Sequence, residues 1–347
     1  MSEPILQVKN LSVSFQTYAG TVQAVRDVSF TLNRGETLAI VGESGSGKSV
    51  TTRALLGILP ANGKITGGSI LYDGHDLTKY SDRDFSAIRG KRISLVFQDP
   101  LSALNPIMRI GKQITEALVL SGKIPRREAK VKALELMRAV GIPEPEKRFR
   151  QYPFQFSGGM RQRIVIAIAL ACDPEILICD EPTTALDVTI QAQILELIND
   201  IKRQKNLSVI FITHDLGVVA NVADRVAVMY AGRIVERATS EELFYDPRSP
   251  YTWALLSSMP DLDTKEALFS IPGTPPNMLY PPPGDAFHER NRYALKIDKR
   301  LQPPEFRVSD THSAATWLLD ERAPQVDMPA SLRARIDRMK ERAAHDE

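Results

Sequence analysis

Hydrophobic positions in the first forty residues follow the period of a β-sheet. Apolar and polar residues alternate across 4–34, and Thr37–Val41 is a short apolar run. Alternation with period two predicts strands with one buried face. Ile93–Phe97 has strand character, and two later runs, Ile176–Cys179 and Val209–Thr213, are continuously apolar. Continuous apolar strands are typical of a parallel sheet covered on both faces, so the sequence predicts an α/β core.

Helical periodicity separates the predicted strands. Val50–Leu59 has a helical pattern that Pro60 ends, and residues 108–150 are predicted to be mostly helical. Arg161–Cys172 is apolar on nearly all sides, which indicates a buried helix. Residues 226–235 predict a hairpin or strand pair around a glycine.

The composition changes after about residue 240. Half of the residues in 272–283 are proline, which predicts an extended linker or a wrapped arm. From Asp320 onward the chain is rich in charges of both signs. That pattern predicts a solvated helix or a disordered tail.

Overall composition is that of an ordinary globular protein. The 347 residues carry 44 Lys and Arg against 42 Asp and Glu, with 43% hydrophobic residues. These values exclude a disordered, collagen-like or strongly basic nucleic-acid-coating chain. The two cysteines, Cys172 and Cys179, lie in apolar segments, so we expect a reducing compartment and no disulfide framework.

No segment of the sequence is predicted to be a signal peptide or to cross a membrane. The amino terminus has neither a basic region nor a long apolar run, and the longest apolar run is Ile164–Cys172. That run is far shorter than the roughly 20 residues that span a bilayer. We expect a soluble chain, and if it works at a membrane, another chain supplies the spanning part.

Residues 42–49 form a glycine-rich motif between a predicted strand and a predicted helix. The residues GESGSGKS match the phosphate-binding pattern G-x-x-x-x-G-K-[ST]. Glycines let backbone amides approach phosphate oxygens, and the following helix points its positive end at them. Lys48 can neutralise phosphate charge, and the Ser49 hydroxyl can bind Mg²⁺. The alternative without a binding function is a glycine-rich turn with an exposed lysine.

Two carboxylates end the apolar run 176–179. Asp180 and Glu181 are placed at the carboxyl end of a buried parallel strand, where open α/β sheets bind ligands. Asp180 is predicted to hold Mg²⁺ directly or through water, and Glu181 to polarise the water that attacks the γ-phosphate. Two acids at a strand end are also common in plain loops.

Further segments resemble the conserved motifs of the ATP-binding cassette (ABC) ATPases. They are the signature Phe156–Arg163, the Q-loop Val96–Pro100, the D-loop Ala185–Asp187 and the switch-histidine segment Ile212–Asp215. Their order and spacing agree with that family across residues 4–240. The family implies a P-loop NTPase (RecA-like) α/β core with an N-terminal antiparallel β subdomain and an inserted helical subdomain at about 99–170.

The C-terminal part resembles the extension of D-type ATPases of oligopeptide permeases from Gram-positive bacteria. Three segments carry the resemblance: Ser249–Thr252, Ile271–Pro276 and Val308–His312. The implied organisation is a nucleotide-binding domain at 1–240 and an extension at 241–347. The signature here contains Met160 where the commonest form has Gln, and residues 284–292 lack the cysteines of many relatives. We therefore expect no iron–sulfur cluster.

The family resemblance implies a role for each motif residue. The phosphate loop would bind ATP through Gly42, Glu43, Ser44, Gly45, Ser46, Gly47, Lys48, Ser49 and Val50. Mg²⁺ would be held by Ser49, Gln98 and Asp180, and His214 would contact the γ-phosphate or the attacking water. Ser157, Gly158 and Gly159 would contact the nucleotide of a partner subunit. Tyr18 is the predicted adenine platform, with Phe15 the alternative.

These resemblances predict the ATP-hydrolysing subunit of a peptide importer. It would sit at the cytoplasmic face of the cell membrane with an F-type ATPase as heterodimer partner, two permease subunits and an extracellular peptide-binding protein. A nickel importer of the same subfamily is the nearest alternative. A soluble ABC ATPase acting on DNA or ribosomes is disfavoured, because the chain has one cassette and no coiled-coil insertion, and no nucleic-acid partner is expected.

Overall fold

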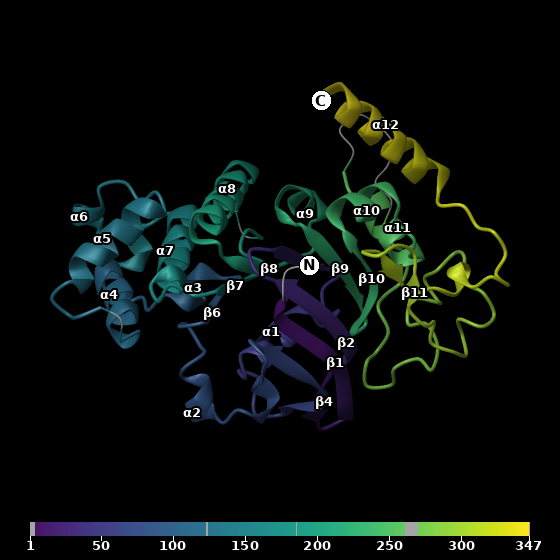
Figure 1. Ribbon diagram of the computed structural model, residues 1–347, viewed down its shortest axis with the longest axis horizontal. Helices are drawn as coiled ribbons and strands as arrows, with labels where there is room; N and C mark the ends of the chain where they lie inside the picture. Colours follow the sequence, from purple (N-terminus) through teal and green to yellow (C-terminus); the bar gives the residue numbers. More distant parts are fainter. Residues whose placement is uncertain (1–3, 123, 185, 261–269, 347) are drawn as a thin grey trace. The chain divides into compact units, whose positions relative to one another are not determined.

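The computed structural model describes residues 4–122, 124–184, 186–260 and 270–346 (Figure 1). The chain forms two compact units. The first unit comprises the amino terminus up to Ile5, Leu32–Thr37 and Lys79–Thr213. The second comprises Leu6–Thr31, Leu38–Thr78 and His214–Glu347, so the phosphate-loop motif shares a unit with the C-terminal part. The domain division expected at residue 240 stays a prediction.

A twisted antiparallel sheet makes up one layer of the second unit. Its strands are β1 (Pro4–Thr17), β2 (Gly20–Asn33), β4 (Gly63–Tyr72) and β5 (His75–Asp76), in the order β2-β1-β4-β5. The alternation in residues 4–34 is confirmed, because Val25, Val28 and Phe30 are buried while their neighbours are more exposed. The short helix η1 (Leu77–Lys79) follows this sheet.

The other sheet of the second unit carries the loop motif at one end. Its strands are β3 (Thr37–Val41), β9 (Arg225–Tyr230), β10 (Arg233–Thr239), β11 (Phe306–Arg307) and β12 (Ser313–Ala314). β3 and β9 run parallel, and β10 returns antiparallel to β9, as the predicted hairpin requires. The turn between them places Ala231 and Gly232 at positive φ, a conformation that suits the twist of a two-residue hairpin.

The second unit also contains helices, several of which pack on this sheet or on one another. They are α1 (Lys48–Leu55), α9 (Leu216–Val222), α10 (Ser240–Tyr245), α11 (Pro250–Ser257), η3 (Trp317–Leu319) and α12 (Ala330–Asp346). The helix predicted over 50–59 ends earlier, at Leu55, because Gly57 at positive φ closes it with the Ile58 amide bonded to the Arg53 carbonyl. α12 is not fully solvated, since Leu332 and Ile336 are buried.

The first unit contains a parallel sheet and a group of helices. β8 (Ser208–Thr213), β7 (Ile176–Asp180) and β6 (Ile93–Val96) lie in that order, and both β6–β7 and β7–β8 pair in parallel. All residues of β7 and β8 are buried, which confirms the reading of their continuous apolar runs. The Cys179 thiol is buried in β7, which raises its pKa, and neither it nor Cys172 is in a disulfide.

Most helices of the first unit cluster beside this sheet, at the left of Figure 1. They are α2 (Asp82–Phe85), α3 (Pro100–Ala103), α4 (Ile110–Leu120), α5 (Ala129–Ala139), α6 (Pro145–Arg148), η2 (Pro153–Gln155), α7 (Gly158–Leu170) and α8 (Val188–Lys205). α7 is buried over most of its length, as predicted, but it begins at Gly158 because Ser157 caps it. Across the described segments, no helix is both long and apolar enough to cross a membrane.

A buried carboxylate ties β10 to the C-terminal part within the second unit. The Glu236 side chain is fully buried and accepts hydrogen bonds from the amides of Arg248 (2.6 Å) and Ser249 (2.9 Å). Its other contact is Nε2 of His312, at 2.8 Å. Removing this carboxylate would leave buried donors without their acceptor.

We therefore expect Glu236→Ala to destabilise the protein by about 3 kcal/mol or more. The measurement is the free energy of unfolding from urea titration followed by circular dichroism. Glu241→Ala, which changes an exposed glutamate on α10, is the control and should leave that energy nearly unchanged. An equal effect of the two changes would contradict the assignment.

Candidate functional site

The loop between β3 and α1 is shaped by its glycines. Gly42, Gly45 and Gly47 all have positive φ. A Cβ at Gly42 would lie 2.1 Å from the Met229 carbonyl oxygen, and one at Gly47 would lie 2.6 Å from that of Ala24. Gly45 instead has no neighbour within 4 Å on that side. Two glycines thus let the loop pack against the sheet, while the third borders open space where an anion could approach.

Lys48 spans the loop from inside. Its side chain is buried, and its Nζ donates to the carbonyls of Gly42 (2.7 Å) and Glu43 (3.0 Å). The ammonium is therefore held beneath the loop at the start of α1, whose N-terminus adds positive potential. The alternative of a glycine-rich turn with an exposed lysine is wrong, because Lys48 is buried.

The loop also contains a buried hydroxyl that suits a polar ligand. Ser46 Oγ is buried, and it finds no hydrogen-bond partner among the residues that the structure describes. The Ser46 main chain is fixed, because its amide donates to the Glu43 carbonyl and its carbonyl accepts from the Gly232 amide. A buried hydroxyl without a partner is unfavourable, so a phosphate oxygen at this position would satisfy it. The loop therefore fits a phosphate group.

The first unit brings two of the predicted residues together. Asp180 is buried at the end of β7, and Glu181 follows at positive φ with its amide bonded to the Ile212 carbonyl. The Glu181 carboxylate accepts from Gln98 Nε2 at 3.1 Å and from Thr184 Oγ1 at 3.0 Å. These two hydrogen bonds hold the carboxylate in one orientation. A carboxylate oriented in this way can act as a general base.

The predicted signature residues lie at the start of α7. The Ser157 hydroxyl accepts from the Met160 amide at 3.4 Å, which confirms its capping role. Ser157 and Gly158 are exposed, whereas Gly159 is buried and its Cβ would lie 2.5 Å from the Ile190 side chain. The exposed capped turn could meet an anion on another molecule, and the buried glycine lets α7 and α8 pack closely.

The remaining predicted residues lie in the second unit. His214 directly follows β8 and is exposed, and Asp215 after it caps α9 by accepting from the Gly217 amide. Tyr18 is fully exposed at the turn between β1 and β2, so its ring face is available to a planar ligand. Phe15 is half-buried, and its ring fills the space above Gly63. Val50 lies in the first turn of α1. Of the D-loop motif, Ala185 lies outside the described residues.

Sequence reasoning missed two kinds of residue. Thr184 binds Glu181, and a hydroxyl three positions after the predicted catalytic carboxylate is a signal that local inspection could have found. Arg290 binds the Glu43 carboxylate through both terminal nitrogens, from 247 positions along the chain. No local pattern marks Arg290, because its partner is set only by the tertiary fold.

Two family models match the chain. The model described as "ABC transporter" matches residues 25–184, and the model described as "Oligopeptide/dipeptide transporter, C-terminal region" matches residues 235–297. The oligopeptide transport ATP-binding protein OppD of Bacillus subtilis is 58% identical over 96% of this chain and 94% of its own. The dipeptide transport ATP-binding protein DppD of Lactococcus lactis is 57% identical over 98% of each chain.

Solved structures with the same fold are ABC cassettes. The dimeric structure of the bacterial cassette MJ0796 has a TM-score of 0.61 and 26% identity, covering 68% of this chain and 98% of its own. The cbiO1 protein of Clostridium perfringens, part of the transporter complex cbiONQ, has a TM-score of 0.61 and 28% identity over 71% of this chain and 92% of its own.

We expect Lys48→Ala to weaken ATP binding by about 10- to 100-fold, because the ammonium is the positive charge held under the loop. Isothermal titration calorimetry with ATP measures this change. Lys64→Ala, which removes an exposed lysine from β4, is the matched control and should bind ATP normally. Unchanged affinity in the Lys48 variant would refute the placement of the phosphates.

Proposed function

The chain belongs to the ABC transporter family, among its oligopeptide and dipeptide transport ATP-binding proteins, and on that premise we propose that it hydrolyses ATP to drive peptide import. The import would proceed through a membrane permease. The observation that carries the proposal is the glycine-shaped loop with Lys48 buried beneath it and a buried Ser46 hydroxyl that has no hydrogen-bond partner within the described part of the chain. The relatives reported above are named for peptides, which favours peptide over nickel as the imported substrate.

Nucleotide binding is assigned to the loop 42–50. The amides of Gly45 to Lys48 and the Lys48 ammonium would surround the β- and γ-phosphates of ATP, with the N-terminus of α1 facing the same charge. Tyr18 is proposed to stack on the adenine ring, because its exposed ring lies on a short turn before the loop. The binding energy comes chiefly from donors arranged around a highly charged group.

Hydrolysis is assigned to the carboxylate end of β7. Glu181 would accept a proton from the water that attacks the γ-phosphorus, while Gln98 and Thr184 keep its carboxylate oriented. His214 is proposed to donate a hydrogen bond to the γ-phosphate or to this water. Cleavage separates a γ-phosphate from ADP and removes negative charge from the loop.

The proposed metal is Mg²⁺, which neutralises phosphate charge when it is bound. The motifs propose Ser49, Gln98 and Asp180 as its ligands, and their hydroxyl, amide and carboxylate oxygens are the donors that this ion prefers. Asp180 is buried at the end of β7. A bound cation would compensate the cost of burying its carboxylate, whereas an apolar neighbour would not.

A second ATPase chain is proposed to complete each nucleotide site. The exposed turn of Ser157 and Gly158 would contact the γ-phosphate held by the partner, with Gly159 setting the close packing behind it. The proposed partner is a non-identical F-type ATPase, so that ATP holds the two chains together and hydrolysis releases them.

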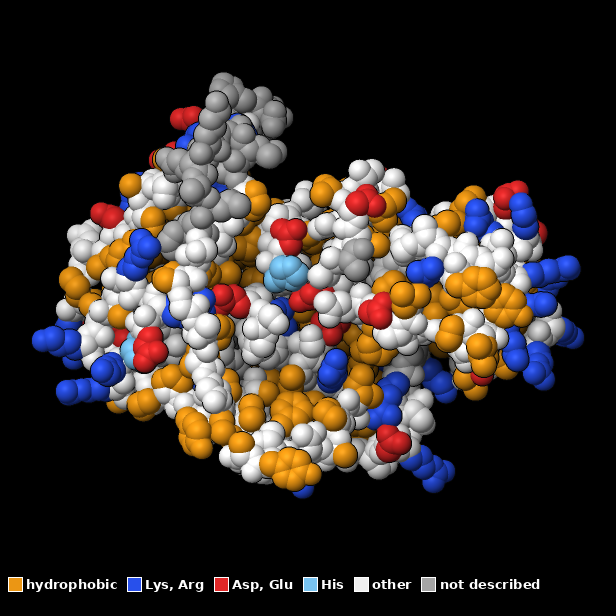
Figure 2. Space-filling view, turned by 180° about the vertical axis from the view of Figure 1, so that it is seen from behind, with side chains coloured by type: hydrophobic (Ala, Val, Ile, Leu, Met, Phe, Trp, Pro, Cys, Tyr) orange, Lys and Arg blue, Asp and Glu red, His pale blue; other side chains and the backbone are white. Residues whose placement is uncertain are grey.

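The helical part of the first unit is proposed to dock on the permease. Among the residues that the structure describes, six of the ten exposed large hydrophobic side chains fall in residues 97–154: Phe97, Leu101, Ile107, Leu120, Val131 and Phe154. The right-hand part of Figure 2 shows orange side chains beside Lys and Arg on this helical part. Such a surface is typical of a protein interface. The chain would then lie at the cytoplasmic face of the membrane, with two permease subunits and an extracellular peptide-binding protein.

We expect Glu181→Gln to reduce ATP turnover by about 100-fold or more while ATP binding persists. Glutamine keeps the shape of the glutamate side chain but cannot accept the proton of the attacking water. Steady-state phosphate release by the assembled transporter, with calorimetry on the purified chain, measures both quantities. Glu196→Gln on α8 is the control and should turn over normally. Normal turnover of the Glu181 variant would exclude this residue as the base.

We also expect Ile107→Ser to reduce binding of the chain to permease-containing membranes by about fivefold. Ile107 is exposed in the isolated chain, and the substitution removes the apolar surface that it would bury against the permease. Co-sedimentation with vesicles that contain the permease subunits measures retention. Leu301→Ser, which changes an exposed leucine of the second unit, is the control. Full retention of the Ile107 variant would count against this docking surface.

A further inference from the structure

An ion pair joins the phosphate loop to the C-terminal part within the second unit. The Glu43 carboxylate accepts from Arg290 Nη1 at 2.6 Å and from Nη2 at 2.9 Å. The Arg290 side chain is 5% exposed and that of Glu43 is 26% exposed. A bidentate arginine–carboxylate pair that is shielded from water has both strength and a defined geometry.

Arg290 is itself firmly held. Its Nε donates to the Pro272 carbonyl at 2.8 Å, and its Nη1 also donates to the Tyr230 hydroxyl at 3.1 Å. The guanidinium lies 5.7 Å from the ring centre of Tyr230 and 5.8 Å from that of Phe287. The hydrogen bond to Glu43 is the largest of the effects that raise the Arg290 pKa. The guanidinium is therefore fixed in place and permanently charged.

Glu43 passes this constraint to the phosphate site. Its amide donates to the Tyr251 hydroxyl at 2.9 Å, so the C-terminal part grips its main chain as well as its side chain. The Glu43 carbonyl accepts from Lys48 Nζ at 3.0 Å and from the Ser46 amide at 3.2 Å. One residue thus contacts Arg290 and Tyr251 on one side, and the phosphate-binding lysine on the other.

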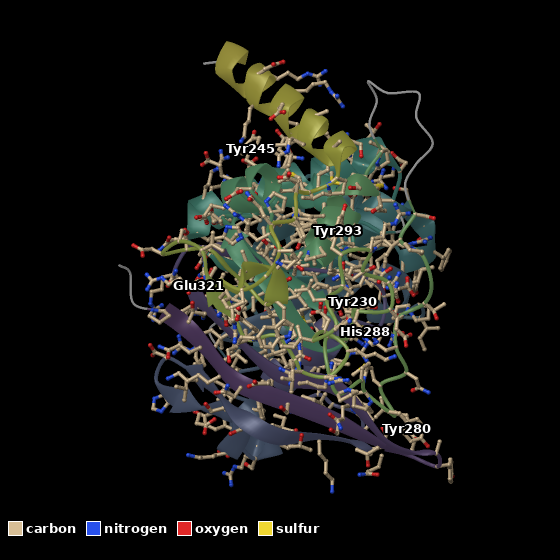
Figure 3. All side chains as sticks on the ribbon, turned by 90° about the vertical axis from the view of Figure 1, so that its right-hand side faces the viewer. Tyr230, Tyr245, Tyr280, His288, Tyr293 and Glu321 are labelled. Atoms are coloured by element: carbon tan, nitrogen blue, oxygen red, sulfur yellow. The ribbon has the colours of Figure 1, made fainter. Side chains whose placement is uncertain are left out.

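The residues that hold Arg290 belong to a rigid part of the second unit. The rings of Tyr230, Tyr251 and Phe287 lie with centres 4.5 to 5.3 Å apart. These rings share one hydrophobic core with β3, the strand that leads into the loop. Figure 3 labels Tyr230 among the side chains of this part. Packing of this kind transmits a displacement instead of absorbing it.

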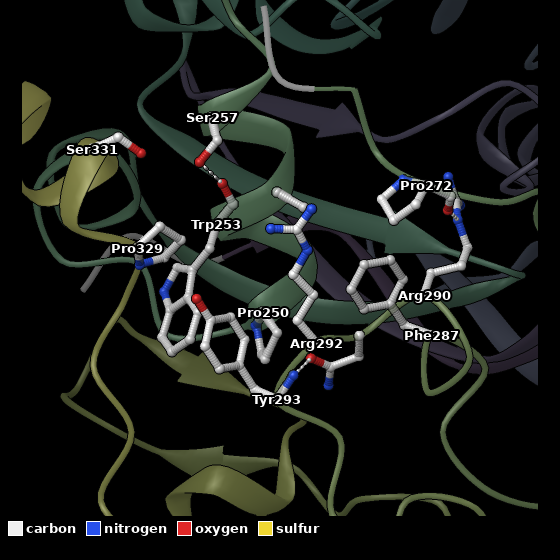
Figure 4. A pocket seen from close by; sticks show the side chains of 12 residues that line it. Pro250, Trp253, Ser257, Pro272, Phe287, Arg290, Arg292, Tyr293, Pro329 and Ser331 are labelled. Carbon is white, nitrogen blue, oxygen red and sulfur yellow. Dashed lines mark hydrogen bonds between the residues drawn. The ribbon is translucent and has the colours of Figure 1, made fainter.

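A cavity of about 130 Å³ lies in the C-terminal part, on the side of Arg290 that faces α11 (Figure 4). Trp253, Phe287 and Tyr293 line it together with Arg290. Arg290 therefore both borders this cavity and contacts the loop.

We propose that Arg290 is a positioning residue for the phosphate loop, through which the C-terminal part pre-organises the ATP site. The proposal rests on the proposed function of the loop. Arg290 holds Glu43, and therefore Lys48 and Ser46, in the conformation that phosphate requires, so less order has to be created when ATP binds. It also neutralises a carboxylate that would otherwise repel the triphosphate.

The test is a set of variants of the full-length chain titrated with ATP by calorimetry. Arg290→Ala should weaken ATP binding by about tenfold, because it leaves Glu43 mobile and unneutralised next to the phosphates. Adding Glu43→Gln to that variant should restore affinity to within about threefold of wild type, since the unpaired charge is then gone. A purely structural arginine would show no such rescue.

The matched control is Arg237→Ala. Arg237 binds Glu305 and the Ser29 carbonyl in the same unit. The substitution therefore removes an arginine–glutamate pair that does not contact the loop. Its ATP affinity should equal that of wild type. Arg290→Lys keeps the charge without the bidentate geometry and serves if the alanine variant does not fold. It should weaken binding by about threefold, and in the assembled transporter the KM for ATP should rise more than kcat falls.

Three results would overturn the proposal: wild-type affinity in both Arg290 variants, no rescue by Glu43→Gln, or an equal loss in Arg237→Ala. Each leaves the proposed ATPase function standing, because absence of ATP binding by the wild-type chain itself is the result in these titrations that would contradict that function. The two failures are therefore distinguished in a single series of titrations.

Discussion

The contact between the Lys48 ammonium and the carbonyls of Gly42 and Glu43 is the interaction on which the shape of the proposed nucleotide site depends. A lysine can be buried at the start of a helix only if acceptors surround it, and these two carbonyls are supplied by the loop it supports. The loop can turn so tightly only because Gly42 and Gly47 have positive φ and lie against other main-chain atoms. The positions of the glycines, the burial of Lys48 and the shape of the loop therefore depend on one another.

The two units contribute different chemistry. The second unit holds positive potential at the loop, whereas in the first unit a buried strand ends at Asp180 and is followed by Glu181. Such a carboxylate is useful only if its orientation is fixed, and Gln98 and Thr184 fix that of Glu181 with neutral donors.

The C-terminal part packs as an integral element of the second unit. Its proline-rich stretch has neither helix nor strand, as an extended arm requires, yet the Pro272 carbonyl binds Arg290. Leu332 and Ile336 of α12 enter the same core as β3, although the charge pattern of the tail predicts only a solvated helix or disorder. This packing places Arg290 and Tyr251 of the C-terminal part in contact with Glu43 of the phosphate-loop motif.

The sequence alone determined the features whose cause is local. Period-two alternation predicted β1 and β2, continuous apolar runs predicted β7 and β8, and the loop motif carries its own chemistry in consecutive residues. Only the tertiary structure decided that Gln98 meets Glu181 and that Arg290 meets Glu43, 247 positions away. Those pairs depend on how distant segments pack, and neither residue has neighbours that mark its partner. The early end of α1 at Leu55, closed by Gly57, likewise required backbone geometry, because a helical pattern does not specify where its closing turn forms.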